Sequence, residues 1–123
     1  MTYRRTRHGA TLVKDGRVLV HGGAGCAASG SCTEAQAGSL GSSEIYDPAA
    51  GIFLPPQMMP AGADRYDHVG VFIKDGHDAA AGDVRLFGGA RGTVGGAHTA
   101  LETTLLYSGG AWCYATSLYS TQK

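Results

Sequence analysis

A stretch near the start of the chain recurs further along, and this repeat restricts the possible folds more than any other feature. The segment "RTRHGATLVKDG" (Arg5–Gly16) aligns with "RYDHVGVFIKDG" (Arg65–Gly76) without a gap. Both copies place Arg-x-x-His at the start and Lys-Asp-Gly at the end. A sequence built from two similar units predicts two similar pieces of structure that pack against each other.

The similarity continues beyond these segments in the same order. Next come "RVLVHGG" in the first copy and "DVRLFGG" in the second. In the second copy an insertion, "HDAAAG", lies before this segment. Then "SSEIYDPAAGIF" matches "TTLLYSGGAW". The matched positions are Gly22-Gly23 with Gly88-Gly89, Tyr46 with Tyr107, and Phe53 with Trp112.

Each copy is predicted to form four short strands. Apolar-rich runs of four to six residues are separated by Asp-Gly, Asp-Pro and Gly-Gly pairs, which are turn and bulge signals. Glycine supplies 20 of the 123 residues, about twice the usual share of roughly 7%, as expected for many tight turns. The predicted strands lie near Gly9–Lys14, Arg17–His21, Ser43–Tyr46 and Phe53, and near Val69–Lys74, Val84–Phe87, Thr104–Tyr107 and Trp112. The strand-bearing segments as a whole are expected near Gly9–His21, Ser42–Leu54, Val69–Phe87 and Thr103–Thr116.

A hydrophobic strand, a diglycine, a tyrosine and then a second aromatic residue resemble the kelch repeat, and the chain is also similar to galactose-oxidase-like propellers. The resemblance implies an all-β fold of two four-stranded antiparallel kelch-type propeller blades. The blades would cover about residues 5–56 and 65–117 of a single unit, residues 1–123. Phe53 stands where the family usually has tryptophan, which leaves the blade boundaries less defined.

Two blades are an incomplete propeller unless further chain or oligomerisation completes them. Kelch propellers usually close with six or seven blades, so three copies of this chain would form a six-blade ring. We therefore expect a homo-oligomer, because the outer faces of the two blades would otherwise stay open. We expect those open faces to carry Leu12, Val20, Phe72 and Leu86.

The resemblance implies recognition through loops on one face of the propeller. The longest predicted loops are Ala24–Gly41, Pro55–Asp64 and Ala90–Ala100, and long loops on a rigid scaffold commonly bind partners. The expected function is a non-catalytic recognition or scaffold module for a protein or carbohydrate partner, with no cofactor and no metal. The candidate binding residues are Arg65, Tyr66, Arg91 and His98. The recurrence of Arg5 as Arg65 leaves a structural contact between blades as the alternative role of that arginine.

Three other functions are considered. Arg7-His8-Gly9 resembles the histidine phosphatase signature, but no helical pattern follows it and His68 repeats the histidine. "FGGARGTVGGAH" lacks the following helix that a phosphate loop needs. A fragment of a galactose-oxidase-like enzyme, or a truncated repeat without activity of its own, stays as the alternative. Cys113 and Tyr114 are neighbours on a predicted strand, so they would point to opposite faces and not cross-link.

Charge and cysteine usage limit the environment. Ten basic and ten acidic residues give no net charge, so we expect no nucleic-acid partner. No apolar run reaches the roughly 18 residues of a membrane span, and no apolar stretch follows the basic start as in a secretory leader. Cys26 and Cys32 are candidates for a local disulfide, with two reduced thiols as the alternative, and Cys113 is left over. A disulfide would be compatible with a secreted or cell-surface protein. The five histidines form no pair at metal-ligand spacing and are expected to be structural or exposed.

Overall fold

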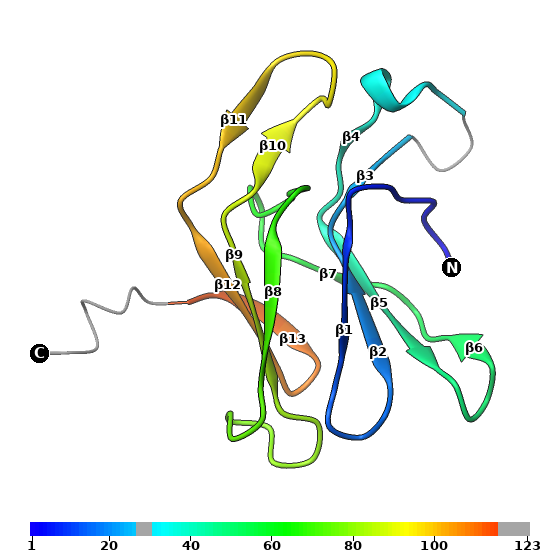
Figure 1. The fold of residues 1–123 in the computed structure, drawn as a ribbon, viewed down its shortest axis with the longest axis vertical. Coiled ribbons are helices and arrows are strands. Elements are labelled where there is room, and N and C mark those ends of the chain that lie inside the picture. The colour runs from blue at the N-terminus through cyan, green and yellow to red at the C-terminus, as the bar shows by residue number, and fades with distance from the viewer. Residues whose placement is uncertain (27–30, 116–123) are drawn as a thin grey trace, which may run out of the picture.

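The computed structural model of the chain describes residues 1–26 and 31–115 and shows an all-β protein built from small antiparallel sheets. Two larger sheets stand side by side, and a two-stranded hairpin extends from each of them at the same end (Figure 1). No helix in the described residues is long and apolar enough to cross a membrane.

The first sheet is an antiparallel meander, with a two-stranded hairpin inserted between its second and third strands. Its order is β1 (Gly9–Leu12), β2 (Val18–His21), β5 (Ser42–Asp47) and β6 (Ile52–Phe53). A further short strand, β7 (Gln57–Met58), pairs with the beginning of β5, whereas β6 pairs with its end. Pro55 and Pro56 lie between β6 and β7, and proline cannot donate a ladder hydrogen bond, so the fourth strand is interrupted there.

The second sheet repeats this topology. Its strands are β8 (Val69–Ile73), β9 (Asp83–Phe87), β12 (Thr104–Ser108) and β13 (Ala111–Tyr114), each paired with the next. The predicted strands agree with these bounds to within two residues at most of their ends. Residues 116 and 117, at the end of the predicted second unit, lie outside the described residues.

The segments predicted as long loops are partly strands. Ala24–Gly41 contains β3 (Ala24–Gly25), β4 (Gly38–Ser39) and a 3₁₀ turn, η1 (Glu34–Gln36), and residues 27–30 of it lie outside the described part. Ala90–Ala100 forms the hairpin of β10 (Ala90–Gly92) and β11 (His98–Ala100). Pro55–Asp64 contains β7. The loop prediction was wrong here because two- and three-residue strands are too short for a periodic signal.

The two diglycines mark the points where the chain leaves each sheet for its hairpin. All four glycines have positive φ: 60° and 100° at Gly22-Gly23, and 66° and 92° at Gly88-Gly89. A side chain would also clash at the second glycine of each pair, because a Cβ added there would lie 2.8 or 2.9 Å from the Cβ of His8 or His68. Glycine is therefore required at these positions for both backbone and packing reasons.

A buried arginine at the start of each copy makes the same set of hydrogen bonds. In both copies Nη1 donates to the first glycine carbonyl of the diglycine and to the carbonyl of a Ser or Thr, and Nη2 donates to the hydroxyl of that Ser or Thr. The equivalent sets are Arg5 with Gly22 and Ser42, and Arg65 with Gly88 and Thr103. The sequence repeat is thus also a repeat of local structure.

The core lies between unlike faces of the two sheets. We call the face that carries Tyr46 or Tyr107 the tyrosine face, and the opposite side the back face. The back face of the first sheet, with Leu19 and Ile45, packs in one cluster with the tyrosine face of the second, with Val84, Leu86, Leu105, Tyr107 and Trp112. Leu86 is fully buried and Phe72 packs against the same cluster, so the expectation that these two lie on an open face was wrong. Val20 is also buried, whereas Leu12 is 65% exposed.

Candidate binding surface

The two hairpins are joined into one surface at the upper end of the molecule in Figure 1. Gly38 of β4 forms a bridge with Thr93. The amides of Val94 and Gly95 donate to the carbonyls of Ala37 and Ala35 at 2.9 and 2.7 Å. These bonds fix the hairpin of one sheet against that of the other. We call this combined region the hairpin surface: residues 31–39 and 90–100 with the segment 61–67.

Asp64 connects the hairpins through polar side chains. One carboxylate oxygen accepts from Arg91 Nε at 2.8 Å, and the other accepts the hydroxyl of Ser39. Ser39 Oγ in turn accepts the Gly92 amide at 3.1 Å. Burial would raise the pKa of Asp64, but the bonds from Ser39 and Arg91 lower it more, so the carboxylate is charged at neutral pH.

A second ion-pair group lies at the junction of the two copies. Arg7 Nε contacts Glu34 and Arg7 Nη1 contacts Asp67, both at 2.7 Å. Arg7 and Asp67 occupy equivalent positions in the repeat and both have φ of 55°. The Asp67 amide also donates to the Arg7 carbonyl. These exposed ion pairs connect Arg7 to two carboxylates of the hairpin surface.

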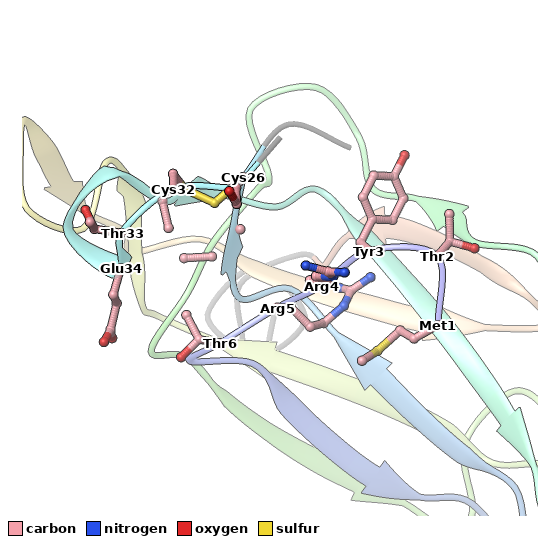
Figure 2. A pocket seen from close by; sticks show the side chains of 14 residues that line it. Met1, Thr2, Tyr3, Arg4, Arg5, Thr6, Cys26, Cys32, Thr33 and Glu34 are labelled. Carbon is pink, nitrogen blue, oxygen red and sulfur yellow. A yellow bond between two sulfur atoms is a disulfide. The ribbon is translucent and has the colours of Figure 1, made fainter. Parts of the chain in front are cut away.

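An open pocket of about 610 Å³ lies beside the first hairpin (Figure 2). It is lined by residues 1–6, 24–26, 31–34 and 37. Tyr3 and the exposed Arg4 lie on one side of it and the Cys26–Cys32 disulfide on the other, as Figure 2 shows. Within the described residues Arg4 has no ion-pair partner. The pocket therefore combines an aromatic ring with a cation that is available to a ligand.

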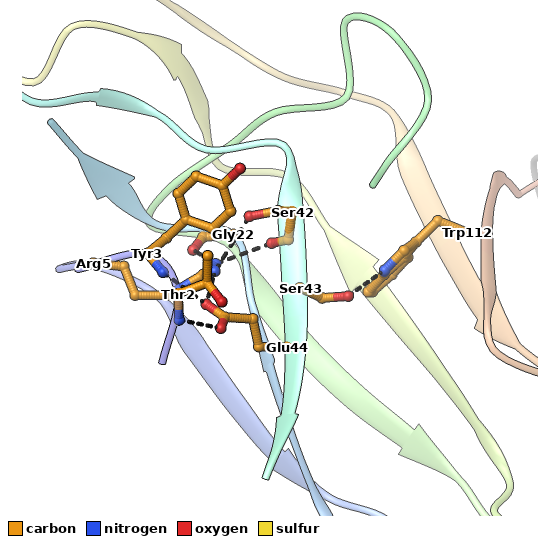
Figure 3. A network of polar contacts seen from close by, with 8 residues as sticks. All are labelled: Thr2, Tyr3, Arg5, Gly22, Ser42, Ser43, Glu44 and Trp112. Carbon is orange, nitrogen blue, oxygen red and sulfur yellow. Dashed lines mark hydrogen bonds and ion pairs between the residues drawn. The ribbon is translucent and has the colours of Figure 1, made fainter. Parts of the chain in front are cut away.

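Arg5, next to Arg4, has a structural role (Figure 3). The side chains of Arg5 and Glu44 are fully buried and form an ion pair at 2.7 Å. The Glu44 carboxylate also accepts the backbone amides of the N-terminal segment. Burial would raise the pKa of Glu44, but these bonds lower it more. On the opposite face of β5, Ser43 accepts the Trp112 indole N–H at 2.7 Å, which links the two sheets.

The predicted site residues divide into two buried and two exposed side chains. Arg65 is fully buried, and Tyr66 is 3% exposed in a small cluster with Ala24 and Ala37. Arg91 and His98 lie on the hairpin surface, where His98 Nδ1 contacts the Gly96 carbonyl. The repetition of Arg5 as Arg65 was the sequence signal for the structural role of that arginine. No sequence pattern singled out Tyr3 and Arg4.

The disulfide candidates are joined in the structure, with Cα atoms 5.8 Å apart, and Cys113 is a free, exposed cysteine. Cys113 lies on the back face of β13, whereas the Tyr114 hydroxyl donates to the Ala61 carbonyl. Neighbouring strand residues point to opposite sides, so the two side chains do not meet.

Two histidines that are far apart in the sequence form a pair, in which His21 is fully buried and His68 is half-buried. His21 Nδ1 lies 2.8 Å from His68 Nε2, and His21 Nε2 lies 2.9 Å from the Thr11 hydroxyl. Burial, followed by the repulsion of neighbouring cationic groups, lowers the pKa of His21 to about 3 and that of His68 to about 4. Both rings are therefore neutral at pH 7 and hold the sheets together as hydrogen-bonding groups. Spacing along the chain could not reveal this pair.

The described residues contain no group of three or more His, Cys, Asp or Glu side chains arranged to hold a metal ion. The polar groups that do converge, such as Arg5 with Glu44 or His21 with His68, are engaged in bonds that connect strands. In comparisons with known proteins, no family model and no curated protein matches the chain.

Proposed function

We propose that the chain is a pair of kelch-type propeller blades that acts as a non-catalytic recognition module. Support comes from two consecutive four-stranded meanders of the same topology, each with a diglycine after its second strand. The equivalent arginine networks of Arg5 and Arg65 add a second, independent correspondence between the copies.

The observation that carries the binding proposal is the joined pair of hairpins with the pocket beside it. Backbone hydrogen bonds between the hairpins make this a preorganised surface, and preorganisation lowers the entropy cost of binding. Arg4 and Tyr3 in the pocket present a cation and an aromatic ring. On the hairpin surface, His98 and the guanidinium of Arg91, whose Nε is paired with Asp64, are exposed. Such groups suit a protein or carbohydrate partner that carries a carboxylate, because a cation and an adjacent ring recognise an anionic group on a partly apolar body.

The proposal is tested by screening the purified chain against acidic peptides and against uronic-acid oligosaccharides. Binding should weaken at least tenfold in Arg4→Ala and, for a ligand that also contacts the second hairpin, in Arg91→Ala. Lys74→Ala is the matched control, because it removes an exposed positive charge from the β8–β9 loop at the other end of the molecule (Figure 1).

Binding that is lost equally in Lys74→Ala would mean a general charge effect and would contradict a site at the hairpins. The enzymatic alternative has its own assay. Stoichiometric copper in the purified chain together with peroxide release from a carbohydrate would replace the non-catalytic proposal.

A further inference from the structure

Two sheet faces have no sheet packed against them, one tyrosine face and one back face, and these are the same two kinds of face that are in contact within the chain. Within the chain, the back face of the first sheet covers the tyrosine face of the second. No second sheet covers the tyrosine face of the first sheet or the back face of the second in the described structure. On the first of these faces the N-terminal segment covers Glu44, and the row that includes Leu12 lies beyond it. Contact between unlike faces is heterologous, so it can be repeated from one copy to the next.

The open tyrosine face has the same pattern as the covered one. In the second sheet, one row across four strands is Phe72, Val84, Tyr107 and Trp112. In the first sheet the equivalent row is Leu12, Val18, Tyr46 and Phe53. The two aromatic pairs also have matching geometry, with ring centroids 4.9 Å apart at 53° in the second sheet and 5.0 Å apart at 54° in the first.

Only the burial of the two rows differs. Val84 is fully buried, and Trp112 and Tyr107 are 8% and 7% exposed, because the first sheet covers them. Leu12 is 65% exposed, and the other members of its row are half-buried. The first sheet thus has an apolar row whose counterpart is already seen beneath a neighbouring sheet.

The open back face of the second sheet carries exposed apolar side chains around Arg85, which takes the place of Leu19. Val69, Val71 and Phe87 are 59%, 43% and 37% exposed, and they occupy the places that Gly9, Thr11 and His21 hold in the first sheet. Apolar side chains at these exposed positions are unfavourable in water, and together they mark an association surface.

Backbone groups that are hydrogen-bonded at the end of the first sheet have equivalents at the end of the second sheet that lack such bonds. The Gly23 amide donates to the Arg65 carbonyl, and the Arg65 amide donates to the Leu40 carbonyl, which joins the first hairpin to the chain entering the second sheet. Their counterparts are the Gly89 amide and the Leu101 carbonyl. Neither has a backbone partner of this kind within the part of the chain that the structure describes.

The N-terminal segment does not block this contact. It lies over Glu44 on the tyrosine face of the first sheet. In the second sheet, Tyr114 contacts the carbonyl of Ala61, so the linker before Arg65 takes the equivalent place there. The linker coexists with a covering sheet in the second unit, and the N-terminal segment can do the same in the first.

We propose that a second copy of this chain docks head to tail, so that the back face of its second sheet covers the tyrosine face of the first sheet, centred on Leu12, Val18, Tyr46 and Phe53. The occupant is a second copy because the chain itself carries the complementary back face, centred on Val69, Val71 and Phe87. This proposal concerns the faces of the two sheets and does not depend on the proposed binding function.

The test uses one variant for each face and their mixture. Leu12→Glu disables the tyrosine face of the first sheet, and Val71→Glu disables the back face of the second. The wild-type chain should sediment at a multiple of its 12.6 kDa mass, and each variant alone should be a monomer. The 1:1 mixture should form a dimer that does not grow, because one intact face of each kind remains. Ala50→Glu, in the exposed turn after β5, is the control and should assemble like the wild type.

Cys113 reports on the same contact from the back face, where it is free and exposed. Cys113 of the Leu12→Glu chain should be alkylated fast when this variant is alone. Its alkylation should slow at least fivefold when a second chain, which carries both Val71→Glu and Cys113→Ser, is added. Circular dichroism and Trp112 emission check that each variant is folded. If Leu12→Glu is not folded, Leu12→Ser replaces it, and if Val71→Glu is not folded, Val69→Glu replaces it.

Each remaining outcome would overturn the proposal. A monomeric wild type would show that the open faces do not pair. An oligomeric Leu12→Glu or Val71→Glu would indicate pairing of like faces or another surface. A mixture that stays monomeric, with unchanged alkylation of Cys113, would exclude head-to-tail docking.

Discussion

Replacing Arg65 by methionine is the sharpest test of how the repeat is held together. Arg65 is fully buried and has no carboxylate partner in the described structure. Its guanidinium instead donates to the carbonyls of Ala63, Gly88 and Thr103 and to the Thr103 hydroxyl, at 2.8 to 3.0 Å. Methionine keeps most of the aliphatic volume and removes every donor, so the change isolates the hydrogen bonds.

The expected loss follows from the acceptors that remain. A buried acceptor left without its donor costs about 1–3 kcal/mol. Three carbonyls are affected, but Thr103 is exposed and water can replace some of its bonds. The desolvation cost of the buried cation is recovered as well. We therefore expect Arg65→Met to lower the free energy of unfolding by about 3–5 kcal/mol, a large fraction of the roughly 5–15 kcal/mol of a typical domain.

The loss is measured by urea unfolding at a fixed protein concentration, followed by the fluorescence of Trp112. Trp112 is the single tryptophan and lies between the sheets, so its emission reports their separation. Arg65→Lys should fall between wild type and Arg65→Met, because a single ammonium cannot reproduce the forked contacts. Arg91→Met, at an exposed ion pair, is the control and should change the midpoint little. Equal midpoints for Arg65→Met and Arg91→Met would refute the structural role of the buried arginine.

Three further predictions concern contacts between and beside the sheets. Trp112→Phe removes the indole bond to Ser43 and should lower stability by about 1–2 kcal/mol, measured by thermal circular dichroism, whereas an unchanged melting curve would contradict that bond. Because the pKa values of His21 and His68 are lowered from 6.5 to about 3 and about 4, the unfolded chain binds protons first, and stability should fall as pH drops from about 6.5 to about 4. Each histidine contributes a slope of up to about 1.4 kcal/mol per pH unit, so His68→Gln should roughly halve the summed slope. An unaltered slope would exclude a contribution from His68. Thiol titration of the denatured, unreduced chain should find one thiol, and reducing the Cys26–Cys32 bond should cost about 2 kcal/mol, whereas three thiols before reduction would exclude the bond.

The sequence determined the strands and their order in each copy, because these depend on local signals. Apolar runs such as Val69–Ile73 end at Asp-Gly or Asp-Pro turns, and the diglycines mark where the chain must adopt positive φ. The recurrence of Arg5 as Arg65 also indicated a structural contact, because the two copies share a fold, but the burial that makes Arg65 inaccessible to a ligand came from the structure.

Only the tertiary structure decided which faces meet and which side chains are available. Strand alternation assigns Leu86 and Leu12 to the tyrosine faces of their sheets, but packing alone buries the first and exposes the second. The His21–His68 pair and the Arg4 pocket likewise unite residues from separate segments, and their distances depend on how one sheet is placed on the other. A repeat in the sequence fixes equivalent positions, whereas burial depends on the neighbour that each face finds, and that neighbour differs between the first copy and the second.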